Sequence, residues 1–208
     1  MASLGNAHGA PDISLLAENP PAGFAVEAIA VRLLPPEEPL AAPLQQRIDT
    51  QWQMHLDHAR AHGKDLFDGP ILSLRQAFVE GGRLHLHLAP STYKRFLITA
   101  LRDRAWFLEH HAAHAIREAL GNSALITSGT PPARALLGIR SPRVSAYPNR
   151  AHLIGGALDA FTPDPANPDS AAPLLAHLQQ EILEETALTP EDFPGPPRLL
   201  ALVRDNTL

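Results

Sequence analysis

Three glutamates without a neighbouring positive charge constrain how the C-terminal part of this chain can fold. Glu181, Glu184 and Glu185 stand at positions i, i+3 and i+4, and residues 151–197 contain no Lys or Arg. If residues 174–188 are helical, this spacing places all three carboxylates on one face of the helix. Like charges so spaced weaken a helix by about 0.2–0.5 kcal/mol per pair, a cost that a divalent cation bound by the carboxylates would remove. The cluster therefore predicts either a magnesium site or a solvated acidic face.

A short apolar strand is predicted before this helix. Residues 152–156 read His-Leu-Ile-Gly-Gly, and glycines allow a backbone to take positive φ or to approach a ligand closely. The helix itself carries an apolar stripe through Leu175, Leu178 and Ile182. One flank of the helix can therefore pack while the glutamate flank stays available. A further strand is predicted at residues 199–203.

The glycine pair followed by the three-glutamate helix resembles the signature of the Nudix hydrolase superfamily. Glu181, Glu184 and Glu185 match the three helix glutamates of that signature, and Ile182 and Leu188 match its aliphatic positions. The triplet is specific to this resemblance because the strand and the glycine pair precede it.

The sequence departs from that signature in several places. Gln180 stands where the signature has arginine, Ala187 where it has glycine and Thr162 where it has a further glutamate. Residues 159–173, rich in Pro, Asp and Asn, predict an inserted loop between the glycines and the helix. Such an expanded signature resembles the UDP-sugar diphosphatase branch. Upstream segments similar to that branch are Trp52 and residues 66–70, 84–96 and 119–126.

The resemblance implies an α/β fold in which a Nudix-like mixed sheet is sandwiched between helices and preceded by an N-terminal α+β extension. It divides the chain into a flexible N-terminus at residues 1–23, an α+β region at 24–118 and a partial Nudix domain at 119–208. A Nudix fold has further strands and a closing helix after the signature. We therefore expect the chain to be truncated at its C-terminus or completed by a partner.

The resemblance also implies metal-dependent hydrolysis of the pyrophosphate bond of a nucleoside diphosphate sugar. UDP-glucose or UDP-galactose would yield UMP and a hexose 1-phosphate. Glu181, Glu184 and Glu185 would hold Mg²⁺ or Mn²⁺, and the carbonyl of Gly155 or Gly156 would add a neutral ligand.

Other residues are candidates for proton transfer and substrate binding. One of the three helix glutamates, or an acid on the inserted loop such as Asp164 or Asp169, would accept the proton of the attacking water. Arg140 would hold phosphate oxygens, the alternative being an ordinary surface arginine. Tyr93 would contact a uracil, the alternative being a core tyrosine. Arg140 belongs to a group that precedes the stretch without Lys or Arg: Arg134, Arg140, Arg143 and Arg150.

Two other classes of function remain open at the level of sequence. Because the signature arginine orients a helix glutamate in the family, its replacement by Gln180 fits a catalytically weak nucleotide-sugar-binding module. A structural or interaction protein with a solvated acidic helix is the second alternative.

Composition restricts the remaining possibilities. The 208 residues are 45% hydrophobic, as in a globular protein, and a net charge of −5 argues against a general nucleic-acid binder. The chain has no cysteine, so disulfides and thiolate metal ligands are excluded. No apolar stretch approaches the roughly 18 residues that span a bilayer, and a cytoplasmic protein without membrane partners is expected.

The eleven histidines raise the question of a zinc site. His110 and His114 stand at i and i+4, but no glutamate separates them as in the H-E-x-x-H zinc motif. Solvated or hydrogen-bonded histidines are the favoured interpretation.

Periodicity and turn residues predict the remaining elements. Helices are predicted at residues 44–62, 91–101 and 103–120. Strands are predicted at residues 24–34, 71–79, 83–88, 123–127, 143–147 and 151–154. This alternation predicts a mixed sheet with helices on both sides.

Overall fold

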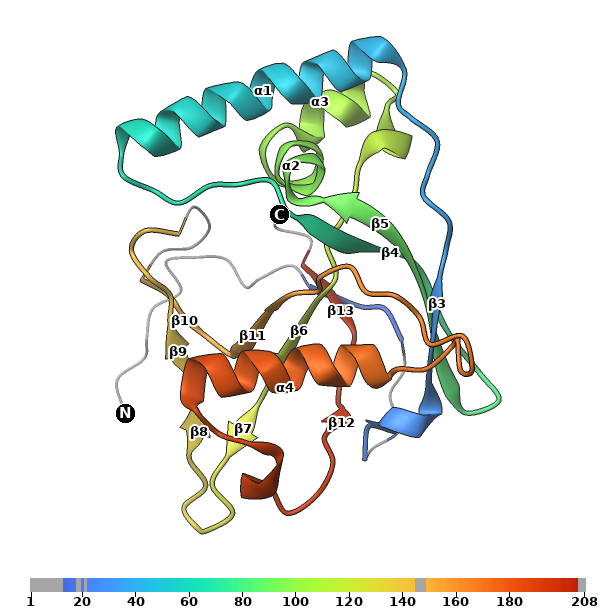
Figure 1. Cartoon of the computed structure of the whole chain (residues 1–208), viewed down its shortest axis with the longest axis vertical. Helices are drawn as coiled ribbons and strands as arrows, with labels where there is room; N and C mark the ends of the chain where they lie inside the picture. Colours follow the sequence, from blue (N-terminus) through green and yellow to red (C-terminus); the bar gives the residue numbers. More distant parts are fainter. Residues whose placement is uncertain (1–12, 18–19, 21, 145–148, 206–208) are drawn as a thin grey trace.

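The computed structural model describes residues 13–17, 20, 22–144 and 149–205 (Figure 1). The helices are α1 (Ala42–Ala61), α2 (Tyr93–Phe96), α3 (Arg104–Glu109) and α4 (Ala172–Thr186). The 3-10 helices are η1 (Val26–Ala28), η3 (Ala113–Ala115) and η4 (Pro190–Asp192), and η2 (Leu97–Arg102) is a π-helix. The strands are β1 (Ile13–Leu15), β2 (Phe24–Ala25), β3 (Ile29–Leu33), β4 (Pro70–Glu80), β5 (Arg83–Thr92), β6 (Gly121–Ala124), β7 (Ile126–Thr127), β8 (Ala135–Leu136), β9 (Gly138–Ile139), β10 (Ala151–His152), β11 (Ile154–Ala157), β12 (Arg198–Leu199) and β13 (Val203–Asp205). The described part of the chain is therefore mixed α/β, which confirms the predicted class at that level.

The largest sheet has the strand order β3-β5-β4. Strand β5 runs parallel to β3 and antiparallel to β4, with which it forms the predicted hairpin. Leu84, Leu86 and Leu88 are buried, and the alternating His85 stacks on Phe78 with ring centroids 4.8 Å apart. The leucines of β5 thus face the core, and the histidines between them lie on the opposite face of the strand, where they contact an aromatic ring.

The other described strands form two-stranded antiparallel pairs. These pairs are β6–β11, β9–β10, β7–β8, β2–β12 and β1–β13. Figure 1 shows α4 alongside β6 and β11, and α1 over α2 and α3 at one end of the molecule.

Three backbone hydrogen bonds join β4 to the β6–β11 pair. The amide of Leu72 donates to the carbonyl of Leu158 (2.9 Å), and that of Leu158 donates to Leu120 (2.8 Å). The amide of Leu120 then donates to Leu72 (2.9 Å), so the three bonds close a ring. Leu72 and Leu158 are buried, and this leucine ring fixes the two sheets to each other.

The first hydrophobic cluster lies under the three-stranded sheet. Val31, Leu72 and Leu86 pack there together with Leu158 and Leu202. It therefore draws residues from both regions into which the sequence analysis divided the chain, and the boundary near residue 118 stays a prediction.

The second hydrophobic cluster lies under α1. The predicted helical stripe is confirmed, since Ile48 and Trp52 are buried against Leu97, Ile98 and Phe107. Thr92 Oγ1 accepts a hydrogen bond from the Arg95 amide (3.2 Å) and caps α2, as expected for the start of the 91–101 helix. Helix α2 continues directly into η2, whose Leu97 and Ile98 are buried in this cluster.

The predicted helix at residues 103–120 is wrong in extent. Helix α3 ends at Glu109, and His111 takes a positive φ of 53°. The chain turns there because the amide of Ala112 bonds to the carbonyl of Phe107 (2.7 Å), which brings Ala112 and Ala115 into the second cluster. Burial of these two residues outweighs continuation of the helix.

Several predicted strands also differ in extent. The 24–34 strand is interrupted by η1, and the 199–203 strand is replaced by β12 and β13. In the 143–147 segment, Arg143 and Val144 lie in a turn, and residues 145–147 lie outside the described residues. Part of the segment predicted to be flexible is strand β1, which pairs with β13; residues 1–12 lie outside the described part.

Truncation of Phe107 tests the second cluster. Phe107 is 0% exposed, so Phe107→Ala should lower the free energy of unfolding by about 3–5 kcal/mol through lost burial and a residual cavity. Met54→Ala, at a position of α1 that is 60% exposed, is the control and should stay within about 0.5 kcal/mol. Urea denaturation measures both; equal losses would show that the cluster does not govern stability.

Candidate functional site

Helix α4 is held against the β6–β11 pair by one side chain. Asn122 of β6 donates from Nδ2 to the carbonyl of Leu174 (3.0 Å), and Ile182 is buried on the same side of the helix. The helix ends at Ala187, which takes the left-handed conformation with φ 60° and ψ 14°. This is the position at which the Nudix signature has glycine, the residue that adopts such a conformation without strain.

The two glycines of β11 allow a close approach of backbone and carboxylate. Gly155 has φ 142°, and a Cβ there would lie 2.2 Å from the carbonyl oxygen of Asn122. A Cβ on Gly156 would lie 2.9 Å from Glu181 Oε2. The Glu181 carboxylate therefore lies directly over the second glycine.

Glu181 lies in a partly buried, acidic environment. Burial raises the pKa of Glu181, a nearby His177 lowers it, and the charges of Glu185, Glu184 and Asp159 raise it further. His177 Nε2 is 3.7 Å from Glu181 Oε1, and His177 Nδ1 is 3.2 Å from Asn122 Oδ1. The charges of three other carboxylates thus act on Glu181 near the C-terminal end of α4.

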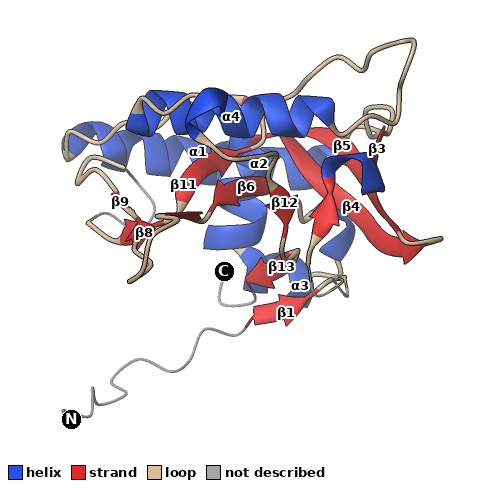
Figure 2. Ribbon diagram, turned by 90° about the horizontal axis from the view of Figure 1, so that it is seen from below, coloured by secondary structure: helices blue, strands red, loops and turns tan. Residues whose placement is uncertain are grey.

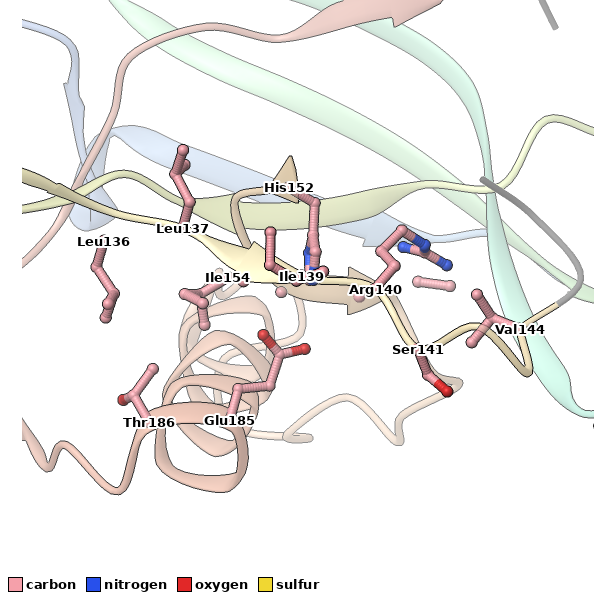
Figure 3. Close-up of a pocket in the computed structure, with 14 residues that line it drawn as sticks. Leu136, Leu137, Ile139, Arg140, Ser141, Val144, His152, Ile154, Glu185 and Thr186 are labelled. Carbon is pink, nitrogen blue, oxygen red and sulfur yellow. The ribbon is translucent and has the colours of Figure 1, made fainter. Parts of the chain in front are cut away.

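The other two glutamates face different surroundings. Gln180, in the place of the signature arginine, donates from Nε2 to Glu184 Oε1. Glu185 lines a cavity of about 570 Å³ between α4 and the strands β9, β10 and β11. Figure 3 shows the Glu185 carboxylate directed from α4 towards the strands that carry Ile139 and Ile154.

The cavity has an apolar wall and a polar edge. The apolar lining includes Leu136, Leu137, Ile139 and Val144, and the polar lining comprises Arg140, Ser141, His152, Glu185 and Thr186. Glycines 138, 155 and 156 complete its strand side. A volume of this size lies in the range of small-molecule sites.

The structure brings most of the predicted site residues together. Arg140, Gly155, Gly156 and Glu185 line the same cavity, and Glu181 adjoins it through Gly156. Tyr93 lies elsewhere, in the second hydrophobic cluster, with its ring 5.9 Å from that of Phe96.

The predicted loop acids bond within the loop or to β3. Asp164 accepts a hydrogen bond from the Ala166 amide (2.9 Å), and Asp169 pairs with Arg32 at 3.7 Å. The acid that interacts with Glu181 is Asp159, at the beginning of the inserted loop. Asp159 lies just after the β11 strand, and this place beside the glycine pair was the sequence signal that could have identified it.

The carboxylate donors of this site fit a hard divalent cation. Carboxylate and carbonyl oxygens are the ligands that Mg²⁺ prefers. The carboxylates of Glu184, Glu185 and Asp159 repel that of Glu181, and a bound cation would reduce this repulsion. Among the described residues, no three His, Asp or Glu side chains already converge closely enough to enclose an ion. Binding would therefore require side-chain rotation of the exposed Glu184 and Glu185.

The histidines outside the cavity make local hydrogen bonds. Nδ1 of His110 lies 2.8 Å from the Trp106 carbonyl oxygen, and Nδ1 of His62 lies 2.8 Å from that of His58. These two contacts confirm the hydrogen-bonded interpretation for His62 and His110.

Comparison with known proteins adds no family assignment. No protein-family model matches this sequence, and no curated protein matches it either. Within the part of the chain that the structure describes, no helix has the length and apolar character needed to cross a membrane.

Alanine at Gly155 tests the close approach of β11 to β6. A methyl group at φ 142° and 2.2 Å from the Asn122 oxygen should displace β11, so Gly155→Ala should lose at least about 2 kcal/mol of stability. Gly195→Ala is the control: no atom lies within 4 Å of its Cβ, and the change should be neutral or stabilise by up to about 1 kcal/mol. Similar chemical denaturation curves for both variants would contradict this strand geometry.

The raised pKa of Glu181 gives a pH test. The folded, metal-free chain holds this proton more tightly than the unfolded chain, so the contribution to stability is present at acidic pH and is lost as pH rises through the raised pKa. Glu181→Gln should therefore raise Tm relative to the wild type at neutral pH more than at acidic pH. Glu80→Gln, at the exposed end of β4, should show no such difference. The measurements are made in EDTA. If the Tm difference between Glu181→Gln and the wild type were equal at the two pH values, or larger at acidic pH, the folded chain would not raise the pKa of Glu181.

Proposed function

We propose that this chain is a Nudix-type hydrolase that cleaves the pyrophosphate bond of a nucleoside diphosphate sugar with Mg²⁺ or Mn²⁺. The observation that carries the proposal is the Glu181 carboxylate over Gly156, beside a cavity lined by Glu185 and Arg140. A strand with a glycine pair, a loop and a glutamate-bearing helix is the arrangement that the Nudix signature encodes.

The position of α4 supports the proposal of a Nudix-like sheet, which is more specific than a mixed α/β fold. Figure 2 shows α4 lying along one face of β6 and β11. A Nudix-like sheet with a helix on this face would include the β6–β11 pair.

The charges around the cavity suit a diphosphate. Arg140 provides a guanidinium that can bind phosphate oxygens in a bidentate manner, and Glu185 lies on the opposite side of the same cavity. Glu181, Glu184 and Glu185 would hold the cation, with a strand carbonyl at Gly155 or Gly156 as a further ligand. When bound, such an ion supplies charge neutralisation and lowers the pKa of a coordinated water.

Hydrolysis requires a proton acceptor and an attack at phosphorus. The oxygen of water attacks one phosphorus of the diphosphate, and the bridging P–O bond breaks. The products are a nucleoside monophosphate and a sugar 1-phosphate. The proton of the water would pass to Asp159 or to one of the helix glutamates, since these are the acids grouped at the end of α4.

The apolar wall supports a substrate larger than a free phosphate. Ile139 and Val144 offer a surface for the ring of a nucleoside or sugar, while Arg140 and Ser141 lie beside them (Figure 3). The UDP-sugar assignment itself depends on the resemblance of the inserted loop and upstream segments to that branch.

One contact favours a second candidate, a nucleotide-sugar-binding module with little catalysis. Gln180 holds Glu184 through a neutral amide and cannot supply the charge of the signature arginine. A less strongly positioned glutamate would bind the substrate and the metal but turn the substrate over slowly.

Replacement of Glu185 tests the proposed function. Glu185→Gln keeps the side-chain shape and removes an anionic ligand, so kcat for UDP-glucose should fall at least about a hundredfold. Glu80→Gln, outside the cavity, should leave kcat unchanged. Release of UMP, followed by chromatography, should stop in EDTA and resume with Mg²⁺ or Mn²⁺.

The same assay separates the alternatives. Full turnover in EDTA would refute metal dependence, and faster cleavage of ADP-ribose than of UDP-glucose would refute the UDP-sugar branch. Calorimetric binding of UDP-glucose without UMP release would identify the binding module.

A further inference from the structure

A group of arginines surrounds Glu37, and none of them lines the proposed catalytic cavity. Glu37 pairs with Arg75 (2.9 Å), with Arg95 (3.5 Å) and, through a short contact, with Arg117. One carboxylate therefore meets three guanidinium groups that come from β4, α2 and the segment before β6.

The inner two arginines are poorly compensated. Arg117 is 5% exposed, and neither its Nε nor Arg95 Nη2 has a hydrogen-bond partner among the described residues. Burial lowers the pKa of both arginines, and the charge of Arg75 lowers that of Arg95 further. A buried cation such as Arg117 is costly unless it is paired and hydrogen-bonded.

A second pair of arginines extends the group. Arg104 of α3 donates to Glu118 Oε1 at 3.2 and 3.3 Å, and Arg204 of β13 donates to Glu118 Oε2 at 2.8 Å. With Arg75, Arg95 and Arg117 this makes five arginines around two glutamates, an excess of three positive charges. This sign is opposite to the net charge of −5 of the whole chain.

A cavity of about 200 Å³ lies within this group. Its polar lining is Ser73, Arg75, Arg104 and Glu118. Ser73 is 1% exposed, and its hydroxyl has no partner in the described part of the chain. Arg75 uses one donor nitrogen for Glu37, although a guanidinium has five N–H donors.

We propose that this cavity binds phosphate, either as orthophosphate or as the phosphate group of a small phosphomonoester, between Arg75, Arg104 and the Ser73 hydroxyl. Guanidinium groups from two elements suit a tetrahedral oxyanion, and a dianion would offset most of the excess charge. The ligand would connect β4 with α3 and so stabilise the junction of the two hydrophobic clusters. Figure 2 shows α3 and β13 on the side away from α4, so this site is separate from the proposed catalytic cavity.

Ser73→Ala is the decisive variant. It removes a buried hydroxyl that has no partner, so the unliganded protein should be as stable as the wild type or more stable. Its phosphate affinity should nevertheless fall about tenfold, because a hydrogen bond to an anion is lost. Ser91→Ala is a matched control, since the Ser91 hydroxyl is also buried without a partner but does not line the cavity.

The measurement is made on the full chain in EDTA, with sodium phosphate compared with sodium chloride at equal ionic strength. Phosphate at ten times its Kd should raise the wild-type Tm by about 3–6 °C, and calorimetry gives the Kd. Arg104→Gln should weaken phosphate binding further. Glu185→Gln should keep the full phosphate response, which separates this proposal from the proposed catalytic function.

The outcomes are distinguishable. An equal phosphate response in wild type and Ser73→Ala, an equal effect of chloride, or loss of the response in Glu185→Gln would each overturn the proposal. Methyl phosphate distinguishes the two ligand sources: tighter binding than orthophosphate identifies a phosphomonoester site, and weaker binding identifies an orthophosphate site.

Discussion

The ring of backbone hydrogen bonds among Leu72, Leu120 and Leu158 determines where the rest of the structure can lie. Each bond contributes only about 0.5–1.5 kcal/mol net, but in the core a broken bond leaves an unsatisfied amide or carbonyl. Leu158 follows β11 directly, so the ring fixes the position of Gly155 and Gly156 relative to β6. The glutamate-bearing face of α4 depends on that position, because Glu181 lies next to Gly156. The candidate site is thus positioned by main chain rather than by its own charged groups.

Two regions of the molecule carry unlike charges. Carboxylates gather around Glu181 of α4, and arginines gather around Glu37 and Glu118. The net charge of the chain hides this division, since the two groups partly cancel in the sum. Each group is crowded with one sign of charge, and under the two proposals each would bind a counter-ion of a different kind.

Local signals predicted α1, α4 and the β4–β5 hairpin, because periodicity and a Gly-Gly turn lie within single short segments. Long-range packing decided the rest: the turn at His111 follows from burial in the second cluster, which no local pattern encodes. The glutamates and glycines of the site were predictable for the same local reason. Asn122 was not, since strand pairing brings it to His177 from 55 residues away. Ala187 takes a left-handed backbone although it is not a glycine, which its residue type did not predict.

The pairing of β1 with β13 has a consequence for when the chain can fold. The Leu16 amide bonds to the carbonyl of Leu202 (2.9 Å), and Ala17 and Leu202 belong to the same hydrophobic cluster. At roughly 5–20 residues per second, about 10–40 s of synthesis separate these two segments at the ribosome. During that interval the first cluster is open on one side, whereas α1 to η3 supply the whole second cluster earlier. The helical end of the molecule is thus available as a template before β13 is synthesised and the sheet closes.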